Sequence, residues 1–179
     1  MAMSKRTVTI KGKIYTLVGP EIKAGQKAPD FNLTAIDFSE ISLSQSGGKV
    51  RLLSVVHSLD TGLCDLQTQW FEEEAAVFKD VVIYTISMDL PFAQARYCGA
   101  KNIINLKTLS DYKFASFGTD YGVLIQELRL LSRAIFIIDA VDMVRYVEYV
   151  PEVGQAPDYD KAIAALKLVS GLAICLEYT

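Results

Sequence analysis

The 179-residue sequence has few of the residues that build metal sites and disulfide frameworks: three cysteines and a single histidine, His57. An odd number of cysteines is unlike the paired cysteines of a small secreted protein. No two cysteines form a Cys-x-x-Cys pair, which is typical of structural zinc sites and of many dithiol oxidoreductases. The sequence therefore predicts neither a disulfide-stapled fold nor a metal site.

Long apolar runs and an excess of positive charge are also missing. The first residues lead into polar, strand-like sequence without the apolar core of a signal peptide. The apolar run at residues 168–176 is far shorter than the roughly 20 residues that a membrane-spanning helix needs. The formal net charge of -3 argues against nucleic acid as the main partner. We expect a soluble, cytoplasmic protein that binds neither membranes nor nucleic acid.

The hydrophobic pattern predicts a single α/β domain over residues 1–179, with an N-terminal hairpin at 1–18 and a C-terminal tail at 169–179. Helical spacing of apolar residues predicts helices at 62–79, 91–99, 110–117 (capped by Ser110) and from Asp158 onward. Strands are expected at residues 8–10, 14–17, 31–34, 50–56, 81–87, 107–109, 133–139 and 143–150. Helices alternating with strands, followed by a late hairpin, indicate a mixed sheet with helices on both faces.

Cys64 stands in the first turn of the predicted helix at 62–79, directly after a buried strand. The helix dipole and the free N–H groups of this turn favour a thiolate. Thr61 suits the N-cap position and would place a hydroxyl near the sulfur. A buried, inert cysteine is the alternative interpretation, and position alone does not separate the two.

Cys98 lies 34 positions after Cys64, at the end of the short helix that Pro91 is expected to begin. A second thiol in the same small domain could capture an oxidised first thiol, and this pairing favours redox chemistry over packing. The alternative for Cys98 is a buried cysteine at a helix end.

Two segments resemble those that carry the cysteines of the thiol peroxidases, the atypical two-cysteine branch of the peroxiredoxins. Residues 58–64 resemble the motif of the peroxidatic cysteine, and residues 87–100 resemble the segment of the resolving cysteine. The similarity extends over roughly residues 7–168. It includes residues 108–112, 121–125, 130–134, 148–150 and 157–159.

The resemblance implies a thioredoxin-like fold and a peroxidase that needs no cofactor. Cys64 would be the peroxidatic thiolate, Thr61 would orient the peroxide, and Arg133 would hold the thiolate and polarise the oxygen–oxygen bond. Without the resemblance, Arg133 reads as an edge-strand arginine in a surface ion pair. Cys98 would resolve the Cys64 sulfenic acid as an intramolecular disulfide, which thioredoxin would reduce. The family also implies a homodimer.

His57 departs from the family pattern, which has proline at this position. A histidine frees the backbone φ angle and adds a titratable ring. One hypothesis is that His57 assists proton transfer, and the other is that it loosens the loop and slows the enzyme. A redox sensor or binding protein with weak turnover is therefore the alternative function. Cys175 lies beyond the matched region and is expected to be a free thiol without a catalytic role.

Overall fold

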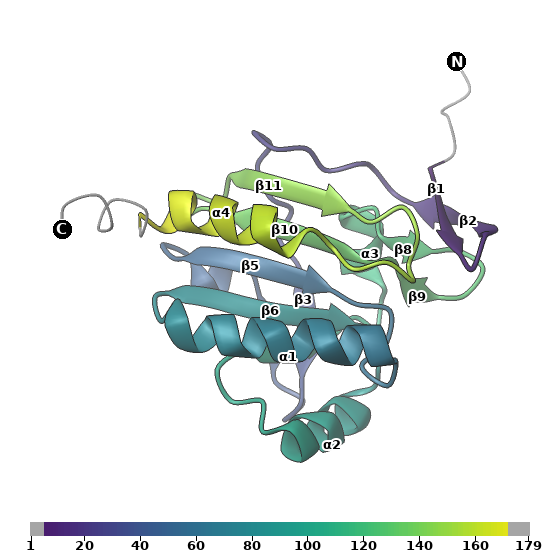
Figure 1. Ribbon diagram of the computed structural model, residues 1–179, viewed down its shortest axis with the longest axis horizontal. Helices are drawn as coiled ribbons and strands as arrows, with labels where there is room; N and C mark the ends of the chain where they lie inside the picture. Colours follow the sequence, from purple (N-terminus) through teal and green to yellow (C-terminus); the bar gives the residue numbers. More distant parts are fainter. Residues whose placement is uncertain (1–5, 172–179) are drawn as a thin grey trace.

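The computed structural model describes residues 6–171 and is built around a seven-stranded mixed sheet (Figure 1). The strands β5, β6 and β7 are parallel and central, and the remaining neighbours pair antiparallel. In spatial order the sheet consists of β11 (Val144–Tyr149), β10 (Ala134–Ile138), β5 (Val50–Val55), β6 (Val81–Ser87), β7 (Lys107–Ser110), β3 (Asn32–Ala35) and β4 (Glu40–Ser42). The predicted α/β class with a central mixed sheet is confirmed.

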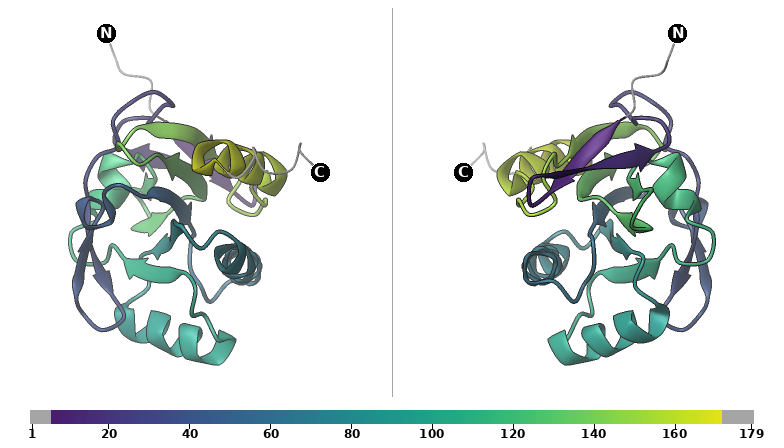
Figure 2. Two further views of the ribbon diagram at one scale, coloured as in Figure 1. Left: turned by 90° about the vertical axis from the view of Figure 1, so that its left-hand side faces the viewer. Right: turned by 90° about the vertical axis from the view of Figure 1, so that its right-hand side faces the viewer.

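Helices cover both faces of this sheet. Figure 2 shows α1 (Gly62–Val77) and α4 (Tyr159–Ser170) on the same side of the sheet. The helix α2 (Pro91–Lys101) packs against β7 and adds Tyr97 and Cys98 to the same apolar cluster. The opposite face is covered by α3 (Ser116–Asp120), the chain before β3 and Leu43, which directly precedes the short 3₁₀ helix η1 (Ser44–Ser46). Alternate residues of β10 enter the two clusters: Ile135 and Ile137 belong to the cluster that includes Ala162 and Leu166 of α4, whereas Phe136 and Ile138 belong to the cluster that includes Phe117 of α3.

A second, small sheet lies beside the end of the main one (Figure 1). It is ordered β1 (Thr7–Ile10), β2 (Lys13–Val18), β8 (Leu124–Ile125) and β9 (Leu130–Leu131). The β1–β2 turn uses positive φ angles at Lys11 and Gly12. Backbone hydrogen bonds from Thr9 N to Pro151 O and from Val153 N to Thr9 O, both 2.9 Å, fasten this hairpin to the chain after β11.

One of the sequence expectations about helix ends was wrong, and two others differ from the structure by two residues. The helix expected at 110–117 with Ser110 as its cap is wrong, because Ser110 ends β7 and α3 begins only at Ser116, after Ala115 in the left-handed conformation. The Asp111 carboxylate accepts from Phe117 N and Gly118 N at 3.2 and 2.7 Å and holds this short helix from its first turn. The helix α2, expected to end near Gly99, ends at Lys101 and is followed by Asn102, whose φ of 54° is the left-handed conformation that asparagine tolerates. The helix expected at 62–79 ends at Val77.

Cys175 and the rest of the expected tail beyond Gly171 lie outside the described residues. Among residues 6–171, none of the helices combines the length and the hydropathy that a membrane span requires.

Candidate active site

Cys64 lies where the central strand β5 leads into α1. Gly62 is the first residue of α1, so Cys64 is the third, as the sequence predicts. Thr61 occupies the N-cap position in an extended conformation, but the expected side-chain cap is wrong: its hydroxyl donates to Ser58 O at 3.0 Å and accepts no helix N–H. Thr61 therefore stabilises the loop before α1 and does not cap the helix.

Arg133 brings a positive charge to the Cys64 sulfur from a distant part of the chain. It precedes β10 and is only 1% exposed. Its Nη2 donates to Cys64 Sγ at 3.3 Å, while Nε and Nη2 both donate to Val153 O at 3.1 Å. Within the described residues Arg133 makes no ion pair, so the alternative of a surface ion pair is wrong. Because no carboxylate among residues 6–171 pairs with the guanidinium, its full charge faces the sulfur, and a hydrogen bond of this kind is stronger to a charged acceptor than to a neutral one.

Gln67 fixes the direction of the Arg133 guanidinium, and the sequence reasoning missed it. It is fully buried on α1, one turn after Cys64, and its Oε1 accepts from Arg133 Nη1. Its Nε2 donates to Ser54 Oγ on β5 at 2.8 Å. A glutamine on the buried face of an amphipathic helix was the available signal, because such a group needs a partner.

A hollow of about 280 Å³ adjoins this arrangement. Its walls come from the β1–β2 turn, the loop before α1 and the chain after β11. The lining residues are Ile10, Lys11, His57, Thr61, Leu63, Arg133, Glu152, Val153 and Gly154. Cys64 is 0% exposed and does not belong to the lining. A molecule in the hollow thus meets Thr61 and Arg133, whereas the sulfur itself is closed off from bulk water in this state.

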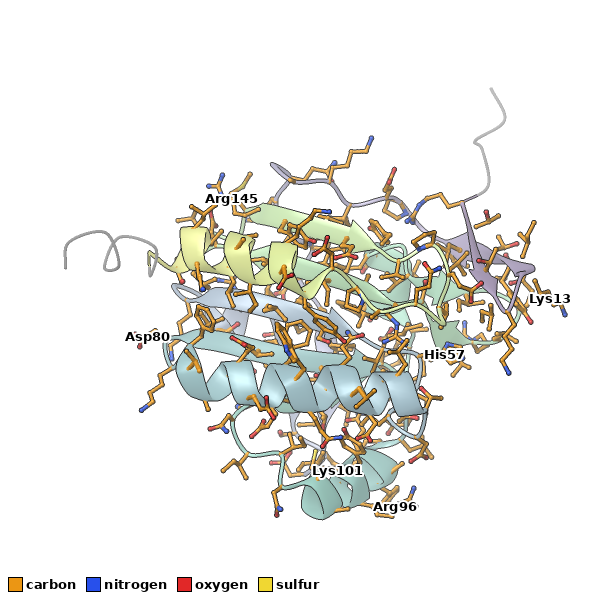
Figure 3. The ribbon with its side chains drawn as sticks, viewed as in Figure 1. Lys13, His57, Asp80, Arg96, Lys101 and Arg145 are labelled. Carbon is orange, nitrogen blue, oxygen red and sulfur yellow. The ribbon has the colours of Figure 1, made fainter. Side chains whose placement is uncertain are left out.

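His57 forms part of the same hollow, at the end of the sheet where α1 begins (Figure 3). Its Nδ1 lies 3.2 Å from Leu131 O, and because a carbonyl only accepts, we assign the proton to Nδ1. Burial of the ring, aided by the charge of Arg133, lowers the pKa of His57 from the usual 6.5, although the Leu131 hydrogen bond opposes this. The ring is therefore neutral at pH 7 and offers Nε2 as an acceptor.

Cys98 faces a different part of the molecule. It is 8% exposed, and its Sγ lies 3.3 Å from Thr108 Oγ1 on β7. Burial raises the pKa of the Cys98 thiol, although the Thr108 hydroxyl opposes the shift. Both cysteines are free thiols. The structure thus brings Cys64, Arg133 and Thr61 together around one site, whereas Cys98 contacts none of them through a hydrogen bond.

Asp89 connects the segments that carry the two cysteines, and the sequence reasoning also missed it. Its carboxylate accepts from Ser58 Oγ and Leu59 N in the loop before α1, both at 2.8 Å. It also accepts from Ser87 Oγ at 2.8 Å, just before α2. Asp89 therefore holds the Cys64 loop against the beginning of the Cys98 helix.

Within the described part of the chain, no three His, Cys, Asp or Glu side chains gather closely enough to bind a metal ion.

Comparison with known proteins identifies the family. The Redoxin family model matches residues 23–163. The thiol peroxidase of Halalkalibacterium halodurans is 55% identical over 161 residues, which cover 90% of this chain and 97% of the relative. The thiol peroxidase of Bacillus subtilis is 52% identical over 160 residues, or 89% and 96% of the two chains. This chain belongs to the thiol peroxidases of the redoxin family.

Solved structures agree with this assignment. A peroxiredoxin-like protein from Aquifex aeolicus superposes with a TM-score of 0.86 at 40% identity, over 92% of this chain and 97% of the other. A thiol peroxidase from Chromobacterium violaceum, at 22% identity, shares the fold with a TM-score of 0.84 over 93% and 98%. The resemblance to the thiol peroxidases and the thioredoxin-like, peroxiredoxin fold that it implied are both confirmed, as is the prediction of a peroxidase.

Proposed function

We propose that this thiol peroxidase reduces hydrogen peroxide and alkyl hydroperoxides with Cys64 as the attacking thiolate. The observation that carries the proposal is the buried contact between Arg133 Nη2 and Cys64 Sγ, in which no carboxylate of the described residues pairs with the guanidinium. The adjoining hollow gives a small peroxide room beside Thr61 and Arg133. Thr61 is proposed to orient the peroxide, and its hydroxyl must then turn away from Ser58 O.

The first step transfers one oxygen atom. The Cys64 thiolate attacks one peroxide oxygen, so that a sulfur–oxygen bond forms and the oxygen–oxygen bond breaks. The departing hydroxide or alkoxide takes up a proton and leaves as water or alcohol. Arg133 stabilises both the attacking sulfur and the charge that develops on the departing oxygen.

The second step joins the two cysteines. The Cys98 sulfur attacks the sulfenic acid of Cys64, forming a sulfur–sulfur bond while the sulfur–oxygen bond breaks and water leaves. Both sulfurs are buried among different partners, and a disulfide requires Cα atoms within about 7 Å. We therefore propose that the segments around Cys64 and Cys98 unwind locally in each cycle.

A thioredoxin-type dithiol is the proposed reductant. It reduces the disulfide by thiol–disulfide exchange and becomes oxidised itself, which returns Cys64 and Cys98 to thiols. Free thiols at both positions suit a reducing cytoplasm. A homodimer is also proposed. Exposed apolar side chains at Phe38, Leu90 and Phe92 support a subunit contact.

Two single variants test the proposed function. Cys64→Ser should abolish peroxide consumption in an assay coupled to thioredoxin and its reductase. Cys98→Ser should react once with peroxide and then stop as a sulfenic acid that a dimedone probe labels on Cys64. Rapid turnover by Cys64→Ser would contradict the proposal.

A redox sensor or binding protein with weak turnover is the second candidate, and the position of His57 in the hollow favours it. Steady-state peroxide consumption separates the two candidates. Slow wild-type turnover that His57→Pro accelerates would favour the sensor, whereas fast wild-type turnover would favour the peroxidase.

A further inference from the structure

The residues next to the two cysteines bind each other across the α1–α2 contact. Asp65 follows Cys64 on α1, and Tyr97 precedes Cys98 on α2. The Tyr97 hydroxyl donates to Asp65 Oδ1 at 2.8 Å. Lys101, labelled on α2 in Figure 3, donates from Nζ to Asp65 Oδ2 at 2.9 Å. One carboxylate on the first helix is therefore held by two donors on the second.

This contact turns the two sulfurs toward different parts of the structure. Successive residues of an α-helix project about 100° apart. With Asp65 and Tyr97 facing each other, Cys64 Sγ points to Arg133 and Cys98 Sγ points to Thr108. A disulfide needs side chains that converge. The Asp65–Tyr97 contact and the disulfide therefore require different orientations of the two helices.

The groups in this contact have the protonation states that make it strong. Burial alone would raise the pKa of Asp65, but hydrogen bonds from Lys101, Tyr97 and Gln69 hold it below its usual value. Burial, and then the Asp65 carboxylate, raise the pKa of the Tyr97 phenol. A carboxylate thus accepts from a neutral phenol and an ammonium group, and hydrogen bonds to a charged acceptor are the stronger kind.

We propose that Asp65, Tyr97 and Lys101 form a latch that holds the resolving helix in the reduced orientation and limits the rate of disulfide formation. The proposal rests on the proposed function, in which Cys98 resolves the Cys64 sulfenic acid. The three residues position the cysteines and exchange no atoms with them. Asp89 still fastens the beginning of α2, so opening the latch frees the part of the helix next to Cys98.

Tyr97→Phe tests the latch because it removes one hydroxyl and keeps the buried ring. Reduced protein is mixed with stoichiometric peroxide, quenched in acid at successive times and analysed by mass spectrometry for sulfenic acid and for disulfide. Formation of the sulfenic acid should keep its wild-type rate, because Tyr97 makes no hydrogen bond to Cys64 or Arg133. Disulfide formation should accelerate about tenfold, because the free energy of one hydrogen bond to a charged group typically corresponds to a factor of about ten.

Tyr146→Phe is the matched control. The Tyr146 hydroxyl donates to the Glu148 carboxylate at 2.8 Å on β11, so its removal also deletes one tyrosine–carboxylate bond. Both rates should stay at the wild-type value in this variant. Lys101→Met provides a second test at a partly exposed site and should accelerate disulfide formation about threefold, as expected for the loss of an ion pair near the surface.

The latch would be overturned by disulfide formation that stays at the wild-type rate, or slows, in both Tyr97→Phe and Lys101→Met. If Tyr97→Phe also lost its reaction with peroxide, the site itself would be disturbed and Lys101→Met would decide. Absence of a Cys64–Cys98 disulfide in the wild type would instead contradict the proposed function, so the two failures are distinguishable.

Discussion

Replacing Arg133 with lysine keeps a positive charge beside Cys64 and removes the planar arrangement of donors that the guanidinium provides. The guanidinium reaches three acceptors at once: the Cys64 sulfur, the Gln67 side chain and Val153 O. A lysine has a single compact ammonium group on a flexible stem and cannot donate to all three acceptors at once. Arg133→Lys therefore separates the contribution of orientation from that of charge.

The structure sets the expected size of the effect. At least one buried acceptor among Gln67 Oε1 and Val153 O loses its donor, which costs on the order of 2 kcal/mol of unfolding free energy. The sulfur loses a donor that is already oriented for the transition state. Loss of one such preorganised donor typically slows a reaction about 100-fold, and we expect this reduction in the rate of sulfenic acid formation.

Stopped-flow measurement of the first turnover, together with urea unfolding, checks both numbers. Arg145→Lys is the matched control, because Arg145, labelled in Figure 3, is half exposed and pairs with the Asp139 carboxylate away from Cys64. It should change neither quantity. If Arg133→Lys formed sulfenic acid at the wild-type rate, the assigned role of the guanidinium in the reaction would be refuted.

Two further predictions concern His57 and Cys175. Because burial lowers the pKa of His57 from 6.5, the unfolded chain binds its proton more readily, and this residue removes unfolding free energy as the pH falls below 6.5. In urea titrations, the unfolding free energy of His57→Asn should fall less over this pH range than that of the wild type. Equal losses would contradict the effect assigned to burial of His57. Burial raises the pKa of Asp111 to about 6, and this residue contributes with the opposite sign but equally in both proteins. Cys175→Ser should leave steady-state turnover unchanged, and a large loss would show that this thiol takes part.

Strong local patterns explain which parts of the fold could be predicted. The apolar run at residues 50–56 and the helical spacing at 62–79 carry their own signal, and both elements formed within two residues of the expected ends. The helix α3 was placed too early because Ser110 resembles an N-cap residue, whereas it is the last residue of β7 and α3 begins at Ser116. Only the folded chain shows that the Asp111 carboxylate reaches Phe117 N and Gly118 N.

The candidate site was predictable only in part, because its long-range contacts leave no signal in the local sequence. Cys64 and Cys98 carry local motifs, and the resemblance added Thr61 and Arg133. The contacts that complete the site join residues far apart in the sequence: Arg133 contacts Gln67 and Val153, and Asp65, beside Cys64, contacts Tyr97, beside Cys98. Such contacts depend on how helices and strands dock, which no local pattern records.

Peptide mass spectrometry of the full chain after reaction with one equivalent of peroxide tests the central claim most directly. We expect a single new cross-link between the peptides of Cys64 and Cys98, with Cys175 still available to an alkylating reagent. A Cys64 that remains reduced while peroxide is consumed, or a cross-link that joins Cys64 to Cys175, would contradict it.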